Sequence, residues 1–151
     1  MKYKRLKAED LQALEKEFIH FLSAAQITGS DWDKMKKENV AGVEELLDVF
    51  SDMVYEKITG KIDYLEQRTE LDLRIFYFGP EKAELIGLKA APGAGIDLRR
   101  KVEAELWDGA VKIYHSEKPY VKDRQVEIFE MLGQGCEITD EKLFRLLKGM
   151  L

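Results

Sequence analysis

The chain has 151 residues, of which 45% are hydrophobic and 35% are charged. This length fits about one domain with a core of its own, and the composition excludes a disordered or fibrous chain. The 24 basic and 29 acidic residues give a net charge of −5, so nucleic acid or an acidic lipid surface would have to be bound through a local basic patch.

Helical spacing of apolar residues dominates the N-terminal part of the chain. Apolar residues three and four positions apart predict an amphipathic helix over residues 8–25. Ser30 and Asp33 resemble a capping box that opens a short second helix. A third helix is predicted to follow Asn39 and to end at Gly60.

The spacing of apolar residues changes from near 3.6 to 2 after Gly60, which indicates strands. Alternating residues predict a strand that ends at Phe78. A turn over residues 79–82 and the apolar residues 85–88 complete a predicted hairpin.

The rest of the chain mixes helices with one more strand. Asp97 is positioned to cap a helix over residues 98–107, and a short strand is predicted over residues 111–115. Two further helices are predicted, one over residues 123–132 and one after Thr139.

We therefore expect one α+β domain over residues 1–151, with a small antiparallel sheet of three to four strands flanked by N-terminal and C-terminal helices. Residues 1–60 should form its helical part and residues 61–120 the sheet with one helix. Residues 121–151 should form a C-terminal helical hairpin.

No run of about 18 apolar residues is present, so we expect no membrane span. The N-terminus is basic, but the residues that follow are charged and do not resemble a signal peptide. These features predict a soluble, cytoplasmic protein.

Several segments together resemble a known family. They are Met1-Lys2-Tyr3-Lys4-Arg5-Leu6, Phe18-Ile19-His20-Phe21-Leu22, Gln26-Ile27-Thr28, Phe50-Ser51-Asp52, Tyr64-Leu65-Glu66, Ile96-Asp97-Leu98 and Gln134-Gly135 with Ile138-Thr139. Across essentially the whole chain, the sequence is similar to an uncharacterised family of small soluble bacterial proteins found mainly in Bacteroidota. The resemblance implies a one-domain cytoplasmic protein and assigns no activity to any residue.

Four carboxylates at intervals of four residues are the most specific feature of the third predicted helix. They are Glu44, Asp48, Asp52 and Glu56, which we call the acidic row. Like charges at this spacing destabilise a helix by roughly 0.2–0.5 kcal/mol per pair, so something should offset their repulsion. Either Lys57 or the basic N-terminal segment folding back neutralises a solvated face, or a basic protein partner binds there. Ligands on one straight helix cannot surround a metal ion, which argues against a divalent metal site.

The two C-terminal helices also permit a helix-turn-helix interpretation. A basic line follows the last helix at Lys142, Arg145 and Lys148. However, Asp140 and Glu141 occupy its first turn, where contacts to bases would have to be made. A packed helical hairpin is the competing interpretation. A second basic cluster, Arg99-Arg100-Lys101, either contacts a phosphate next to the loop 90–95 or is a solvated helix start, and the solvated start is favoured.

Few residues offer catalytic or metal-binding chemistry. Cys136 is the single cysteine, which excludes an intramolecular disulfide and fits a reducing compartment. His20 and His115 lie in no recognisable nucleophile motif, and one cysteine with two separated histidines excludes the usual zinc sites. The loop Ala90–Gly95, which departs from the family's pattern, lacks the signature of a phosphate-binding loop. We assign no catalytic, cofactor-binding or metal-binding residue and expect no cofactor.

The aromatic run 75–78 predicts a strand that is apolar on both faces. Ile75 and Tyr77 are expected in the core. Phe76 and Phe78 belong either to the core or to an exposed face that mediates dimerisation or binding.

These observations favour a non-enzymatic interaction or accessory module in which the acidic row meets a basic partner. The alternative from another class is a nucleic-acid-binding regulator that uses the basic line of the last helix. A small enzyme with a site near His115 or Cys136 is the third hypothesis, and the oligomeric state stays open, a homodimer included.

Overall fold

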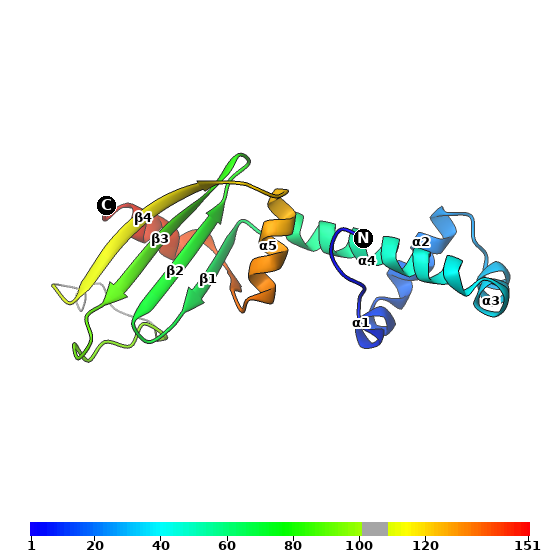
Figure 1. The fold of residues 1–151 in the computed structure, drawn as a ribbon, viewed down its shortest axis with the longest axis horizontal. Helices are drawn as coiled ribbons and strands as arrows, with labels where there is room; N and C mark the ends of the chain where they lie inside the picture. The colour runs from blue at the N-terminus through cyan, green and yellow to red at the C-terminus, as the bar shows by residue number, and fades with distance from the viewer. Residues whose placement is uncertain (101–108) are drawn as a thin grey trace. The chain divides into compact units, whose positions relative to one another are not determined.

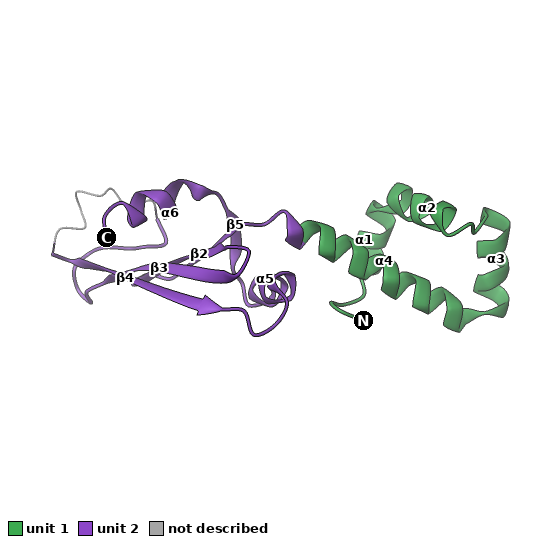
Figure 2. Cartoon of the chain, turned by 90° about the horizontal axis from the view of Figure 1, so that it is seen from above, with its two compact units in different colours: residues 1–58 green, residues 59–151 purple. Residues whose placement is uncertain are grey.

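The computed structural model describes residues 1–100 and 109–151, shown in Figure 1. The fold is α+β, as predicted. The chain divides into two compact units, residues 1–58 and residues 59–151 (Figure 2). The division lies close to the predicted end of the helical part at residue 60, and joint folding of the two units as one domain stays a prediction.

The first unit consists of helices. They are α1 (Ala8–Ala13), α2 (Glu15–Ala24), α3 (Gly29–Glu38) and α4 (Val40–Gly60), whose last two residues belong to the second unit. The helix predicted over residues 8–25 is interrupted at Leu14, where φ is −102° and ψ is 25°. The capping box of α3 lies two residues before the predicted one: the Thr28 hydroxyl accepts from Asp31 N and the Asp31 carboxylate accepts from Thr28 N. This pair satisfies two backbone donors where the helix starts, and it lowers the pKa of Asp31.

Aromatic rings form much of the interior of the helical unit. The ring centroid of Phe18 lies 5.2 Å from that of Trp32 and 5.0 Å from that of Phe50. Phe21 completes the group at 5.5 Å from Phe50. These edge-on and tilted pairs join α2, α3 and α4, because each ring comes from the apolar face of its helix.

The second unit contains an antiparallel sheet. Its strands are β1 (Tyr64–Arg68), β2 (Asp72–Phe78), β3 (Lys82–Ala90), β4 (Val111–Pro119) and β5 (Glu137–Thr139). The spatial order is β4-β3-β2-β1-β5, so the sheet has five strands where three to four were predicted. The last strand has only three residues, which is too short for an alternating pattern to reveal it.

The helices α5 (Arg124–Gly133) and α6 (Glu141–Lys148) pack against opposite faces of this sheet (Figure 2). Phe144 and Leu147 of α6 pack in the core that contains Ile75 and Ile86. Ile128 of α5 packs in a second core, together with Leu65, Phe78 and Cys136. The two helices therefore do not form the expected hairpin, because β5 pairs with β1 between them and directs the chain from one face of the sheet to the other.

The aromatic run of β2 is divided between the two cores. Ile75 is fully buried and Tyr77 packs at the edge of its core, on the α6 face. Phe78 is buried on the α5 face, and Phe76 is half-buried beside it. The question left open by the sequence is thus answered for Phe78, which is a core residue.

The helix predicted over residues 98–107 falls largely on residues 101–108, which lie outside the described residues, as does Lys101. Leu98 is fully buried and donates its backbone N–H to Glu70 O at 2.8 Å. Over residues 1–100 and 109–151, no helix combines the length and the apolar character needed to cross a membrane.

Candidate functional site

The acidic row lies along α4, and the first residues of the chain run beside it. Asp52 accepts two backbone N–H groups, from Lys2 at 2.7 Å and from Tyr3 at 2.9 Å, one on each carboxylate oxygen. Glu56 accepts from Lys2 Nζ at 2.9 Å and from the Tyr3 hydroxyl. The C-terminal half of the row therefore binds an extended segment through both its backbone and its side chains.

Arg5 occupies the N-terminal half of the row. Its Nε donates to Asp48 Oδ1 at 2.7 Å, and its Nη2 lies 3.4 Å from Glu44 Oε2. The hydrogen bond from Arg5 holds the pKa of Asp48 below its usual value. Charge-assisted bonds of this kind are stronger than bonds between neutral groups.

Leu6 anchors the N-terminal segment, which we define as residues 2–6. The backbone N–H of Leu6 donates to Ser51 Oγ at 2.9 Å, and this hydroxyl donates to Leu47 O at 2.7 Å. The Leu6 side chain and Ser51 are both buried. A buried apolar anchor and cationic side chains together hold the segment on α4, so the N-terminal segment is the counter-charge that the like charges of the row require.

The row keeps open surface despite these contacts. The side chains of Glu44 and Glu56 are 56% and 44% exposed. Val49 and Met53 lie on the same helix, 45% and 54% exposed, and line a shallow depression together with Asp52, Glu56, Lys2 and Lys57. We call the acidic row with Val49 and Met53 the α4 surface.

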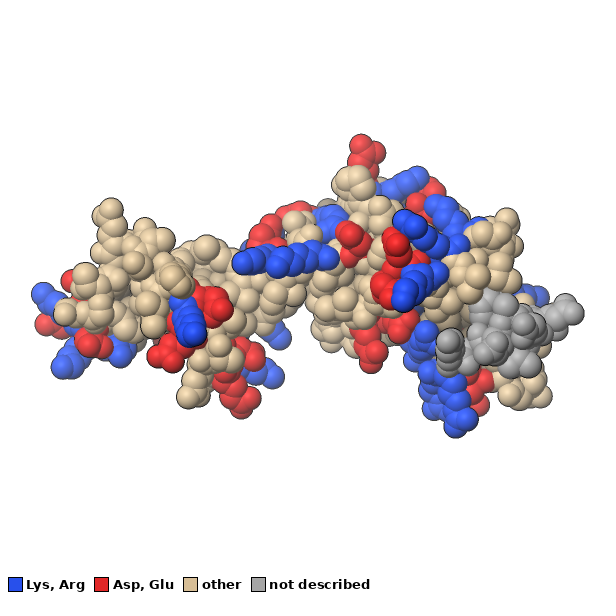
Figure 3. Space-filling view, turned by 180° about the vertical axis from the view of Figure 1, so that it is seen from behind, with Lys and Arg blue, Asp and Glu red and all other residues tan. Residues whose placement is uncertain are grey.

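The basic line of α6 lies in a different setting. Arg145 Nη2 is 2.9 Å from Glu141 Oε2, and Lys148 Nζ is 3.1 Å from Glu84 Oε2. Asp140 caps the helix by accepting from the backbone N–H of Lys142 at 2.9 Å. Two of the three cations thus have an acidic partner, and on the face shown in Figure 3 basic and acidic side chains are interspersed.

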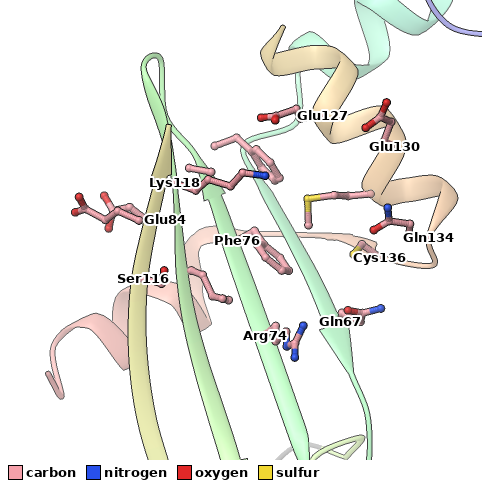
Figure 4. A pocket seen from close by; sticks show the side chains of 15 residues that line it. Gln67, Arg74, Phe76, Glu84, Ser116, Lys118, Glu127, Glu130, Gln134 and Cys136 are labelled. Atoms are coloured by element: carbon pink, nitrogen blue, oxygen red, sulfur yellow. The ribbon is translucent and has the colours of Figure 1, made fainter. Parts of the chain in front are cut away.

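A hollow of about 400 Å³ lies between α5 and the sheet (Figure 4). The strand register aligns Phe76, Leu85 and Ser116 across β2, β3 and β4 on the α5 face. Because α5 packs against Leu65 of β1 and Phe78 of β2, it leaves a hollow between itself and the strands β3 and β4. Of the residues that line the hollow, the sequence singled out Phe76 and Cys136. Strand alternation, which places Arg74 on the same face of β2 as Phe76, was a signal for the other lining residues on strands.

The hollow does not bring the suggested catalytic residues together. Cys136 lines it and is buried, and burial raises the pKa of its thiol. His115 pairs with Ile86 in the register, and its Nε2 lies 3.4 Å from Glu84 Oε2, on the α6 face. A thiol whose pKa is raised and which the sheet separates from the histidine lacks the activation that a nucleophilic cysteine needs.

Among the described residues, a cluster of possible metal ligands was missed by sequence reasoning. Ligand atoms of Glu84, His115 and Glu117 lie within 4.8 Å of one another. Both carboxylates already have ammonium partners, Lys148 at 3.1 Å from Glu84 and Lys82 at 2.7 Å from Glu117. A metal ion would have to displace these lysines. We therefore interpret the cluster as a surface network of ion pairs.

Comparison with known proteins gives a family without a function. The chain belongs to the family of unknown function DUF6495, whose model matches residues 1–151. This match confirms the expected membership of an uncharacterised family. No curated protein and no solved structure matches the chain.

Proposed function

We propose that this family member is a non-enzymatic, cytoplasmic protein-interaction module whose α4 surface binds a basic segment of a partner protein. The observation that carries the proposal is the docking of the chain's own basic N-terminal segment on the acidic row. Asp52 receives two backbone N–H groups and Asp48 receives a guanidinium. This set of contacts is suited to an extended basic peptide.

The N-terminal segment is tethered, which limits how a partner can bind. A tethered segment competes with an effective concentration in the millimolar range, so a partner that only copied its contacts would be displaced. Val49 and Met53 lie outside those contacts and are half-exposed. A partner whose apolar side chain covers these two residues would bury apolar surface in addition to copying the hydrogen bonds of the N-terminal segment.

Long-range attraction also supports a basic partner. Glu44 and Glu56 remain about half exposed at the two ends of the row. Such partly exposed charges steer an oppositely charged partner and weaken as salt is added. Binding should therefore be strongest at low ionic strength.

The test compares two variants during affinity purification from the native host at low salt. Met53→Lys removes the apolar contact and adds a repelling charge on the α4 surface. Ile19→Lys is the matched control, because Ile19 of α2 is similarly exposed at 56%. We expect a basic protein that co-purifies with the wild type and with Ile19→Lys but not with Met53→Lys, and that elutes as salt is raised. Equal recovery with Met53→Lys would contradict the proposal.

A further inference from the structure

The hollow between α5 and the sheet has the dimensions of a small-molecule site. Its volume of about 400 Å³ falls within the usual range for ligand pockets, roughly 300–1,000 Å³. All of its lining residues belong to the second unit. Figure 4 shows side chains of β1, β2, β4 and α5 around one space.

The floor of the hollow is apolar. Phe76 and Leu85 are half-buried on adjacent strands. Met131 of α5 lines the hollow with them and packs, like Phe76, against the core that contains Phe78 and Ile128. An aromatic ring between these groups would remove apolar surface from water at about 25 cal/mol per Å². Methionine sulfur against a ring adds a further favourable contact. The floor therefore favours a flat, apolar body.

The rim is polar, and much of it has no partner in the protein. Gln67, Ser116, Lys118 and Gln134 line the hollow, and among the described residues no hydrogen bond or ion pair involves their side chains. Side-chain amides and a hydroxyl on a concave, partly apolar surface are the groups that orient a ligand. Here they are available to do so.

Charge at the rim points to an anion. Four acids line the hollow, and each has another partner. Glu84 pairs with Lys148 and Glu117 with Lys82. Glu130 pairs with Lys122, and Glu127 accepts from Val121 N at 3.3 Å. Lys118 lies over the hollow in Figure 4 and has no acidic partner among the described residues. The other lining cation, Arg74, lies 3.3 Å from Asp72. An anionic group beside Lys118 would therefore satisfy the lining cation that has no acidic partner among the described residues.

We propose that this hollow is a binding site for a small aromatic carboxylate, with the ring between Phe76, Leu85 and Met131 and the carboxylate beside Lys118. The site is separate from the α4 surface, which belongs to the other unit. Its occupation and the proposed function can therefore succeed or fail independently.

The test uses 2-naphthoate as the probe, followed by calorimetry and by NMR shifts of the full chain. Lys118→Glu reverses the charge at the rim and should weaken binding about tenfold or more, the loss expected for one charge-assisted hydrogen bond. Lys112→Glu is the matched control, because Lys112 is on the same strand and the same face but outside the hollow. Leu85→Arg, which fills the floor, should abolish binding.

A second probe tests the charge of the ligand. The cationic analogue 2-naphthylmethylamine has the same ring, and we expect it to bind wild type more weakly than 2-naphthoate and to gain affinity in Lys118→Glu. Equal binding of the two probes, equal losses in Lys118→Glu and Lys112→Glu, or no binding of 2-naphthoate would overturn the proposal. NMR shifts confined to Phe76, Leu85 and Met131 would support it.

Discussion

Tyr114 lies directly over Gly87, so that a Cβ atom on this glycine would be 2.0 Å from Cζ of the tyrosine. The two residues face each other across β3 and β4. The hydroxyl of Tyr114 continues past the glycine and donates to Asp72 Oδ1 at 2.9 Å. Burial is the larger cause of the raised pKa of Tyr114, and the hydrogen bond to Asp72 is the second cause. The missing side chain of Gly87 is thus the space that the ring occupies.

Gly87→Ala should destabilise the sheet, because the methyl group would displace the Tyr114 ring and its hydrogen bond. Overpacking of this kind costs typically 1–3 kcal/mol. Denaturant unfolding of Gly87→Ala, Tyr114→Ala and the double variant measures the effect. We expect the double variant to lose less stability than the sum of the two single losses, since the clash needs both side chains. Additive losses of stability would show that the packing of the Tyr114 ring does not depend on the missing side chain of Gly87.

Parts of this fold could be predicted because their causes are local. The helix after Asn39 ends at Gly60 as expected, since a long apolar stripe and a terminal glycine both lie in the sequence. The capping box was placed at Ser30 although Thr28 forms it, because both pairs have the same spacing and the sequence alone does not rank them.

The remainder depends on contacts between distant residues. The acidic row was identified from its spacing, but the choice of the N-terminal segment over Lys57 as its counter-charge required the bond between Arg5 and Asp48. The hollow was not predicted, because its existence depends on which part of the sheet α5 covers. That choice is made by Ile128 and Phe78, which are 50 residues apart in the chain.

Asp48→Asn should remove part of the acid sensitivity of the helical unit. Arg5 lowers the pKa of Asp48 below its ordinary 3.8 in the folded chain. A lowered folded-state pKa contributes stability that is present above the unfolded value and is lost as the pH falls through the folded one. Below about pH 4, the melting temperature of the wild type should therefore fall further than that of Asp48→Asn.

Asp33→Asn is the control for this titration, because Asp33 lies on the exposed side of α3 and is 70% exposed. Melting temperatures from pH 2 to pH 7 provide the measurement. Identical acid profiles for wild type and Asp48→Asn would show that the bond to Arg5 contributes nothing in solution.

Arg124→Ala should destabilise the second unit more than most surface changes. The Arg124 side chain is 17% exposed, and its Nη2 donates to Ile62 O at 2.7 Å and to Phe78 O at 3.0 Å. Its loss leaves two carbonyl groups without a charged donor, which we expect to cost roughly 2–4 kcal/mol. Denaturant unfolding measures this loss.

Two further variants separate the forked geometry of Arg124 from its charge. Arg124→Lys keeps the charge but not the planar fork, so it should recover only part of the stability. Lys122→Ala, which removes an exposed ion pair with Glu130, should cost less than about 1 kcal/mol. Full recovery by lysine would mean that charge alone matters at this position.

The basic line of α6 provides the test of the alternative function. Arg145 and Lys148 are paired with acids, and Asp140 and Glu141 lie at the start of the helix. These charges oppose the approach of phosphates, so we expect no gel shift with duplex DNA or RNA at low salt.

The variant that replaces Lys142, Arg145 and Lys148 by alanine makes this expectation falsifiable. Its control replaces Lys34, Lys36 and Lys37 of α3, which changes the net charge by the same amount on an exposed helix. A salt-dependent shift that the α6 variant loses and the α3 variant keeps would favour a nucleic-acid-binding regulator over the interaction module. A shift lost equally in both variants would reflect net charge alone, because phosphate contacts without a specific site depend only on the number of cations.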